Sequence, residues 1–519
     1  MTNLGKEILD FLATPSLKDG RKSLYKLLGA DENEANVYYL VPLLNLKSII
    51  CDEGIKCREE VGKDAEDLSG QEVQAKRDAS LKLARILLYD FDIKQKKIHE
   101  CIGFFWNPLN DTFYAFQRNS LLTAAEKDDD NYGVVCILEM KLSELLDSDK
   151  VYWTTSEQNL ASNYFSSFSK KIYREFKWNE IFSVPSDKGD NHEEKNKFRS
   201  SEFTVFYGTN NKNSKPIPLA FIKRILVHKQ YENRVKKVLL SVQEKIDFLE
   251  NPKIFRPKEE LLKAEKLLIN DMDELQKLQL PLLSIEGICK VINSFSEFKE
   301  KIGCSLTDKV FIYNKNMAYS QHGISHITRV MFWIHILCYL TDTSWETEKA
   351  TQYAAFIHDL CRKDNRMEEE EHGSSAVKEY GDFLRKKIPE NLLQSCKNAV
   401  IYHCKDDGGC PDKNNRLWKM LKDADALDRG RFGCPNTSKG CNVKLLRLDI
   451  FQDRKLADRC AWLACSLAHT THYTKWSENT FMDFKKGILK GLKAIRRNDI
   501  LDPEYTKIAG KCINYLSDS

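Results

Sequence analysis

The sequence lacks the features that would assign it to several large classes of protein. Its start has neither the apolar core nor the cleavage site of a signal peptide, and the apolar run 330–340 is too short to span a bilayer. The formal charge is only +4, from 80 basic and 76 acidic residues, which by itself is too small at 519 residues to indicate nucleic-acid binding. Internal repeats and low-complexity stretches are absent as well. We therefore predict a cytosolic protein without a membrane segment.

Closely spaced cysteine pairs and glycine-rich loops are also missing. In the cytosol the 16 cysteines are expected to be reduced thiols rather than disulfides. Cys404, Cys410, Cys434 and Cys441 could form a zinc site, but their loops lack the Cys-x-x-Cys spacing that is typical of one. Between residues 36 and 240 glycine is sparse, and neither a phosphate-binding loop nor a Rossmann fingerprint appears. Any nucleotide must be held there in another way.

The order of sequence patterns predicts a multidomain protein, as its length of 519 residues suggests. In the first part, short β-branched or aromatic runs such as VYYLVPL, GVVCILEMK and EFTVFYG alternate with helical or polar stretches, which indicates an α+β domain. Long charged helices follow, and from residue 305 onward almost every segment has a helical pattern. We predict an α+β domain at 1–245, a helical connector at 246–303 and an all-α domain at 304–519.

Histidines are concentrated in the C-terminal domain, where six of eleven lie between 322 and 403. The cluster and the acids near it comprise His322, His326, His358, Asp359, His372, His403, Asp423, Asp425 and Asp428. A lone histidine is more often an ordinary core or surface residue, and we interpret His335, His469 and His472 in that way. Five histidines with matched carboxylates instead favour a site for one or two divalent ions, such as manganese, iron, nickel, zinc or magnesium. Two such ions can clamp a phosphate and activate water.

The motifs HGxxHxxRV, HD followed by Arg, HG followed by small residues, and KDADALDR occur in that order over 305–451. This pattern resembles the bacterial HD-domain metal-dependent phosphohydrolases. The resemblance implies a first metal held by His326, His358, Asp359 and Asp425, and a second site completed by His372 and His403. It also implies that Arg329 and Arg362 meet substrate phosphate. The family often has a paired histidine where this chain has Tyr402-His403-Cys404, which bears on the second metal.

A second ordered series of motifs, over 37–240, resembles the DarT toxins, which are NAD-dependent ADP-ribosyltransferases that modify bases in DNA. The closest matches are IGFFWNPLNDTFY and RSSEFTVF, and the second implies that Glu202 is the catalytic glutamate. Arg77, in QEVQAKR, would be the arginine near the NAD phosphates or the target base. A carboxylate near the nicotinamide ribose can stabilise positive charge at the anomeric carbon, and an arginine can clamp a diphosphate.

Aromatic residues in the same motifs are candidates for cofactor binding. Phe105, Trp106 and Tyr114 could stack on nicotinamide or on a splayed base. The family's early His and Thr, which help to bind NAD, align here with Tyr39 and Val41. We place Tyr39 among the expected cofactor-binding residues, with NAD binding and target choice left open by this departure.

Together these patterns predict a bifunctional enzyme, with an ADP-ribosyltransferase acting on a nucleic-acid base or nucleotide and an HD phosphohydrolase. By analogy, such a fusion suits a toxin or an antiphage defence protein. One alternative is a single-activity HD nucleotide phosphohydrolase or phosphodiesterase with a non-catalytic N-terminal recognition domain. Another is a pair of degenerate nucleotide-sensing modules. The acceptor, the hydrolase substrate, the metal and the oligomeric state stay open.

Overall fold

A computed structural model describes residues 3–61, 100–147, 151–159, 170–185, 197–207, 215–278, 284–364, 371–471, 480–497 and 502–517. Arg77 and His472 lie outside these ranges, so their predicted roles cannot be compared with the structure. The chain forms two compact units, Met1–Leu261 and Leu262–Ser519. Each unit is described by itself.

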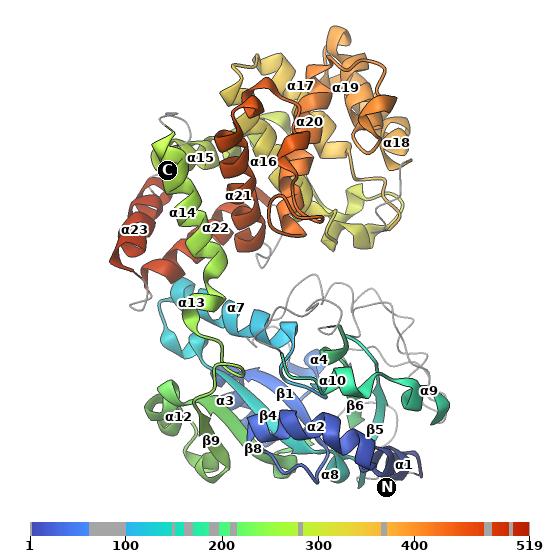
Figure 1. The fold of residues 1–519 in the computed structure, drawn as a ribbon, viewed down its shortest axis with the longest axis vertical. Helices are drawn as coiled ribbons and strands as arrows, with labels where there is room; N and C mark the ends of the chain where they lie inside the picture. The colour runs from blue at the N-terminus through green and yellow to red at the C-terminus, as the bar shows by residue number, and fades with distance from the viewer. Residues whose placement is uncertain are drawn as a thin grey trace. The chain divides into compact units, whose positions relative to one another are not determined.

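A seven-stranded mixed sheet forms the centre of the first unit in the part of the chain described (Figure 1). In spatial order its strands are β5 (Val151–Thr155), β6 (Glu202–Tyr207), β3 (Ile102–Phe105), β1 (Asn36–Pro42), β4 (Val135–Lys141), β8 (Ile222–His228) and β9 (Ile246–Leu249). Neighbouring strands are antiparallel except β8 and β9, which are parallel. A separate antiparallel pair joins β2 (Gly54–Ile55) to β7 (Ile217–Pro218). The predicted central sheet is therefore confirmed.

Helices flank this sheet (Figure 1). They are α1 (Asn3–Leu12), α2 (Pro15–Leu28), α3 (Leu43–Cys51), α4 (Arg58–Val61), α7 (Asp111–Lys127), α8 (Leu142–Asp147), α9 (Lys170–Glu175), α10 (Trp178–Ile181), α12 (Glu232–Val238) and α13 (Lys258–Leu261). Helix α2 starts with proline in its first turn, where a missing N–H costs nothing, and it buries Leu24, Tyr25 and Leu28. The side chain of Asn110 caps α7 by accepting a hydrogen bond from Phe113 N at 3.0 Å.

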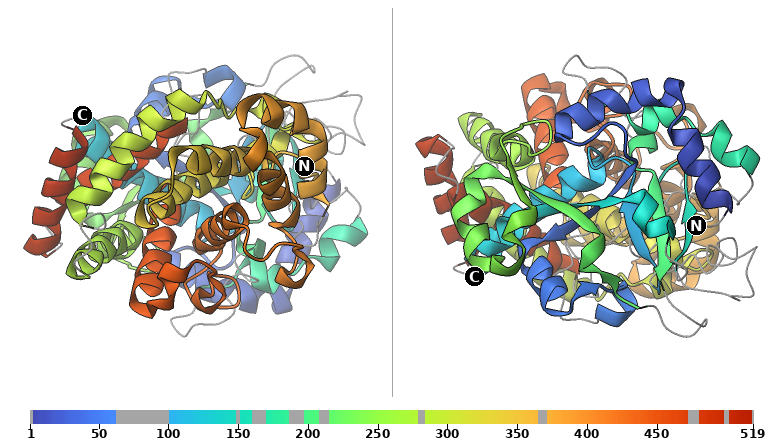
Figure 2. Two further views of the ribbon diagram at one scale, coloured as in Figure 1. Left: turned by 90° about the horizontal axis from the view of Figure 1, so that it is seen from above. Right: turned by 90° about the horizontal axis from the view of Figure 1, so that it is seen from below.

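The second unit is helical throughout its described residues. Its α-helices are α14 (Lys263–Lys277), α15 (Ile285–Ile302), α16 (Ile324–Leu340), α17 (Trp345–Ile357), α18 (His372–Lys387), α19 (Glu390–Tyr402), α20 (Arg416–Asp428), α21 (Arg454–Thr471), α22 (Thr480–Arg496) and α23 (Pro503–Ser517). Helix α16 is buried on almost every side and contacts α15, α17, α20 and α22, as its apolar sequence VMFWIHILC predicts. The left view of Figure 2 shows the helices of this unit from above. Within the residues described, we found no helix with the length and apolar character needed to cross a membrane.

The segment predicted as a connector, 246–303, is divided between the two units rather than standing apart. Strand β9 extends the sheet of the first unit by pairing with β8. Helices α14 and α15 instead pack into the second unit, where α14 contacts α21 and α15 contacts α23. The reason is the apolar stripe of α14, whose Leu268, Ile269 and Met272 are buried. The apolar stripe is hard to recognise in the sequence because charged residues dominate the composition of this segment.

Asp271, on α14, is a buried carboxylate at this contact. Its side chain accepts a hydrogen bond from Ser466 Oγ at 2.8 Å, and Arg459 Nη1 lies 3.8 Å from its other oxygen. Burial raises the pKa of Asp271 to about 6. Because this folded-state pKa is above the unfolded value, the charged carboxylate destabilises the fold increasingly as pH rises from about 4 to about 6.

We therefore expect Asp271→Asn to stabilise the full chain at about pH 8 by on the order of 2 kcal/mol and to have little effect at about pH 4. Asparagine still accepts a hydrogen bond from Ser466 but carries no charge. Urea unfolding at the two pH values measures the difference, and Asp273→Asn, on the same helix but partly exposed, is the control. An equal effect of Asp271→Asn at both pH values would contradict this explanation.

Candidate active sites

Asp359 lies at the centre of the histidine cluster in the second unit and is 2% exposed. One carboxylate oxygen, Oδ2, is 3.0 Å from His322 Nδ1, 3.5 Å from His326 Nε2 and 3.7 Å from His358 Nε2. The other oxygen, Oδ1, is 3.1 Å from His372 Nε2 and 3.7 Å from His403 Nε2. The carboxylate thus faces one group of histidines with each oxygen, which is the arrangement of a ligand shared by two metal ions.

The hydrogen bonds of the histidines fix which ring nitrogen faces the site. His358 Nδ1 is 2.6 Å from Ala355 O, and His403 Nδ1 is 2.6 Å from Val400 O. A carbonyl oxygen only accepts, so both Nδ1 atoms carry the proton and both Nε2 atoms present a lone pair. Each ring bonds to the last turn of its own helix, α17 or α19, whose carbonyls have no helical partner.

Asp428 fixes the position of the proton on the ring of His326. Its Oδ2 accepts from His326 Nδ1 at 2.7 Å, so the Nε2 lone pair of His326 also faces inward. His326 Nε2 and His358 Nε2 are 3.1 Å apart, and Asp425 Oδ1 is 3.4 Å from His326 Nε2. The lone pairs of His326 Nε2 and His358 Nε2 face each other at 3.1 Å and repel unless a cation lies between them. The donor set therefore fits a divalent metal ion.

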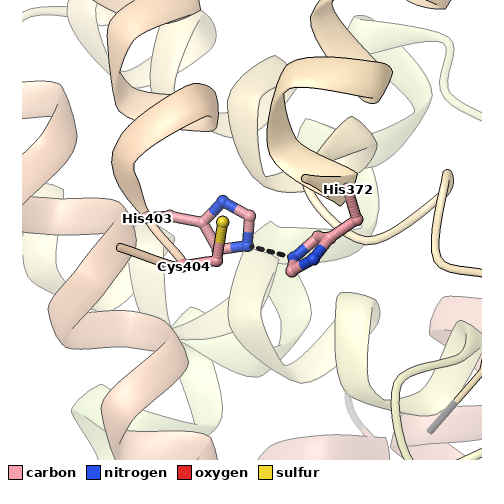
Figure 3. A group of neighbouring side chains, drawn as sticks. All are labelled: His372, His403 and Cys404. Atoms are coloured by element: carbon pink, nitrogen blue, oxygen red, sulfur yellow. Dashed lines mark hydrogen bonds between the residues drawn. The ribbon is translucent and has the colours of Figure 1, made fainter. Parts of the chain in front are cut away.

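His372, His403 and Cys404 form a second group of possible donors (Figure 3). His372 begins α18, while His403 and Cys404 follow the last residue of α19. The Nε2 atoms of the two histidines are 3.1 Å apart, and Cys404 Sγ lies within 4.8 Å of a ring nitrogen of each histidine. All six residues predicted as metal ligands are therefore brought together, with Cys404 and His322 in addition.

A glycine allows α18 and α19 to approach each other at this point. A Cβ atom at Gly373 would lie 2.4 Å from Val400 O, which is far inside van der Waals contact. Val400 O is also the acceptor for His403 Nδ1. The glycine of the HG motif therefore lets the start of one helix reach the end of the other, so that His372 and His403 meet.

At four residues of the cluster, burial and neighbouring charges shift the pKa toward the protonation state that binds metal. Burial lowers the pKa of His358 to about 3 and that of His322 to about 4. Burial alone would raise the pKa of Asp359, but the surrounding imidazoles, His358 first, hold it well below its usual range. His326 and His358 likewise outweigh burial at Asp425, where the pKa is lowered. Neutral imidazoles and ionised carboxylates are the forms that bind a divalent cation.

The arginines near the site differ in what they contact. Arg329 donates to Asp428 through Nε at 2.7 Å and Nη2 at 3.2 Å, so it orients that carboxylate. Arg362 Nη1 lies 3.3 Å from His372 Nε2 and 3.7 Å from Asp359 Oδ1, at the site itself. Arg431, which the sequence motifs did not single out, donates to Asp428 and reaches within 3.5 Å of His322 Nδ1. Of the two arginines predicted to meet phosphate, Arg362 is the better placed.

Among the residues described, the other histidines and cysteines belong to none of the possible metal groups. His335 contacts Glu348 at 2.5 Å, as expected of an ordinary helix residue. Among the residues searched, the possible metal groups include Cys404 only together with His372 and His403. Cys410, Cys434 and Cys441 belong to none of these groups. The site formed from four cysteines is therefore not found in the part of the chain described.

In the first unit, Glu202 is the first residue of β6 and is 1% exposed. Its backbone is fixed by the end of β5, because Ser156 N and Thr155 Oγ1 donate to Glu202 O at 2.9 and 3.1 Å. The side chain lies beside β3, where a Cβ atom at Gly103 would be 3.3 Å from Glu202 Oε2. The glycine of the IGFFW motif thus leaves room for the carboxylate of the RSSEF motif.

The four aromatic residues predicted to bind cofactor occupy different environments. Phe105 pairs directly with Glu202 across β3 and β6, so the two side chains share a face of the sheet. The ring of Tyr39 is 5.7 Å from Phe104, which pairs with Phe203 instead. Tyr39 therefore lies on the side of the sheet opposite Phe105. Only Phe105 stands next to Glu202.

The rings of Trp106 and Tyr114 contact other side chains of the protein. Trp106 is fully buried, with ring contacts to Trp178, Phe182 and Phe203, and its Nε1 donates to Thr155 Oγ1 at 2.7 Å. Thr155 Oγ1 donates in turn to Glu202 O, so Trp106 supports the backbone of the glutamate. The guanidinium of Arg256 lies 4.4 Å from the centre of the Tyr114 ring. The fully buried ring of Trp106 leaves no room for a stacked ligand, and the ring of Tyr114 already has a guanidinium next to it.

Comparison with known proteins gives a match for the first unit. Residues 38–256 match the family model described as "ssDNA thymidine ADP-ribosyltransferase, DarT". Two similar solved structures are those of Thermus sp. 2.9 DarT, one in complex with ADP-ribosylated ssDNA and one with NAD+. The first has 13% identity and a TM-score of 0.32, and the match covers 42% of this chain and 94% of that one. The second has 13% identity, a TM-score of 0.28, and coverage of 41% and 93%.

No curated protein matches the chain. These TM-scores are too low for the structural likeness to support an assignment. The family match covers less than half of the chain. It nevertheless confirms that the N-terminal unit carries a DarT-type ADP-ribosyltransferase domain. The match ends at residue 256, so the HD resemblance of the second unit rests on the residues themselves.

Proposed function

We propose that the protein joins two activities, transfer of ADP-ribose from NAD to single-stranded DNA and metal-dependent hydrolysis of a phosphate ester. The family match over 38–256 supports the first, and thymidine is the nucleoside named in the description of that family. The convergence of lone pairs on Asp359 supports the second. Such a fusion suits a toxin or defence protein in which the hydrolase acts on the modified product or controls the transferase.

In the transferase we assign the catalytic role to Glu202. The bond between the anomeric carbon and nicotinamide breaks, with the electron pair leaving on nicotinamide, and a base nitrogen forms the new bond and gives up its proton. A buried carboxylate stabilises the positive charge that develops at that carbon, because little water screens it. Phe105, the cross-strand partner of Glu202, offers the nearest aromatic ring for stacking. Arg77 remains our candidate for holding phosphate.

In the hydrolase we assign His326, His358, Asp359 and Asp425 to a first metal ion and His372 and His403 to a second. Ions bound there would polarise a phosphoryl oxygen and supply an activated water. The protein's own contribution is to hold the donors in place: Asp428 orients His326, Ala355 O and Val400 O orient His358 and His403, and Arg362 carries the positive charge nearest to the pair of sites. An arginine in that position suits a phosphate oxygen of the substrate.

Two assays on the full chain test the two activities separately. Single-stranded oligonucleotides with and without thymidine, incubated with NAD, are expected to gain the mass of ADP-ribose only when thymidine is present. Nucleotides, cyclic dinucleotides, ADP-ribose and the modified oligonucleotide are then screened for phosphate-ester cleavage, which a chelator should stop and added Mn²⁺ or Zn²⁺ should restore.

The alternatives give different results in these assays. Hydrolysis without any transfer from NAD would favour a hydrolase with an N-terminal recognition domain. Neither activity, together with no bound metal, would favour a pair of sensing modules. Transfer without cleavage of any phosphate ester would contradict the hydrolase assignment alone.

A further inference from the structure

We propose that Cys404 is a metal ligand and that His372, His403 and Cys404 hold a thiophilic divalent ion, in first place zinc, beside Asp359. This inference rests on the metal-dependent hydrolase proposed above, and it specifies the chemistry of the second site. It makes the two sites unlike each other. The first has only nitrogen and oxygen donors, whereas the second has a sulfur donor as well.

The three side chains are held in position by the ends of two helices (Figure 3). His403 and Cys404 follow α19 directly, and His372 starts α18. The separation of 3.1 Å between the two Nε2 atoms is close to the roughly 3.3 Å expected for two imidazoles on one tetrahedral zinc ion. Asp359 Oδ1, at 3.1 and 3.7 Å from these two atoms, is a further possible donor beside the two histidines.

Each donor can present its lone pair to an ion with little rearrangement. His403 already has its proton on Nδ1, where it is bonded to Val400 O. Cys404 is half-buried, and its thiol makes a long contact of 3.8 Å to Ile401 O, which a bond to metal can replace without disturbing the helix. Gly373 provides the close approach between the two helices that brings all three together.

The donor types determine which ions the two sites prefer. A thiolate is a soft ligand, and with two imidazoles it favours zinc or ferrous iron over manganese and magnesium. The first site, formed by His326, His358, Asp425 and one oxygen of Asp359, has a harder set of donors that accepts manganese as well. Cys404 is also the only cysteine in any possible metal group among the residues searched, although most of the other cysteines are buried.

Cobalt substitution of the full chain tests the inference, because Co²⁺ bound to thiolate gives a charge-transfer absorption in the near ultraviolet that Co²⁺ bound only to nitrogen and oxygen lacks. We expect the wild-type protein to bind about two ions per chain and to show this band. Cys404→Ser should lose the band and bind about one ion. Cys404→His should restore the second ion without the band. His358→Ala should lose the other ion and keep the band.

Cys434→Ser is the matched control, because Cys434 is an exposed cysteine of the same unit that belongs to no possible metal group. It should leave both the band and the metal content unchanged. A wild-type protein that binds cobalt without the band, or a Cys404→Ser variant that keeps it, would overturn the assignment of Cys404. If the band depends on Cys404 but the protein cleaves no phosphate ester, the ligand assignment stands and the hydrolase proposal fails.

Discussion

Asp359→Asn is expected to abolish phosphate-ester hydrolysis, by on the order of 10³-fold or more, and to remove both metal ions. Asp359 is the one carboxylate that lies within 3.7 Å of His326, His358, His372 and His403 among the residues described. Asparagine has the same shape, but it is uncharged and turns an N–H₂ group toward imidazole nitrogens on one side. Both ions lose their shared ligand in a single substitution.

Metal content by mass spectrometry of the native protein, together with phosphate release, measures this effect. Asp382→Asn is the matched control, since Asp382 is an exposed residue of α18 that pairs with Arg385 at 3.0 Å. ADP-ribosyl transfer by Asp359→Asn should stay at the wild-type level, which shows that the first unit has folded. If Asp359→Asn keeps its metal and its hydrolase activity, the histidine cluster is not the hydrolytic site.

Glu202→Gln is expected to reduce ADP-ribosyl transfer by on the order of 10³-fold and to leave hydrolysis unchanged. Glutamine fits the same volume beside Gly103, and the hydrogen bonds that fix residue 202 to β5 come from its backbone. The substitution therefore removes the negative charge with little effect on the fold. The missing charge matters most in the transition state, when positive charge develops at the anomeric carbon.

Transfer is measured with labelled NAD and a thymidine-containing oligonucleotide under single-turnover conditions. Glu250→Gln serves as the control, because Glu250 is an exposed acid of the same unit, 3.5 Å from Lys229. Wild-type rates in Glu202→Gln would show that another residue carries the reaction. A loss of thermal stability in Glu202→Gln alone would point instead to a structural role.

The sheet of the first unit was largely predictable from sequence, because most of its strands are runs rich in β-branched or aromatic residues. Strand β9 was not, since IDFL is short and lies at the edge of a charged segment. It becomes a strand only because β8 offers a parallel partner. Because charged residues dominate 246–303, the sequence suggested a separate connector there. In the structure, residues up to 261 belong to the first unit and the rest of this segment to the second.

The residues of the proposed metal site could be predicted to lie together, but the separate roles of its aspartates could not. KDADALDR offers three aspartates of similar appearance, and only the packing of α20 decides their roles. Asp425 faces His326 Nε2, Asp428 holds His326 Nδ1, and Asp423 accepts from the backbone of Leu448 at 2.8 Å. Spacing along a helix narrows the candidates, but rotation about the helix axis is set by tertiary contacts.

Cys404 was missed because the sequence grouped it with other cysteines rather than with histidines. The available signal was its position directly after His403, at the place where the resembled family often has a second histidine. Trp106 shows the opposite error, since an aromatic residue in a motif suggested a ligand contact. Whether such a ring faces a ligand or the core depends on neighbours such as Trp178 and Phe182, which are more than 70 residues away in the chain.

The presence of two separate active sites in one chain is tested most directly by mass spectrometry of a thymidine-containing single-stranded oligonucleotide incubated with the full chain and NAD. The reaction is run with a chelator and, in parallel, with Mn²⁺ or Zn²⁺. We predict that the mass of ADP-ribose is added under both conditions, and that cleavage of a phosphate ester, in the product or in an added nucleotide, appears only with metal. An oligonucleotide that stays unmodified by the wild-type protein under both conditions, or that Glu202→Gln modifies equally well, would contradict it.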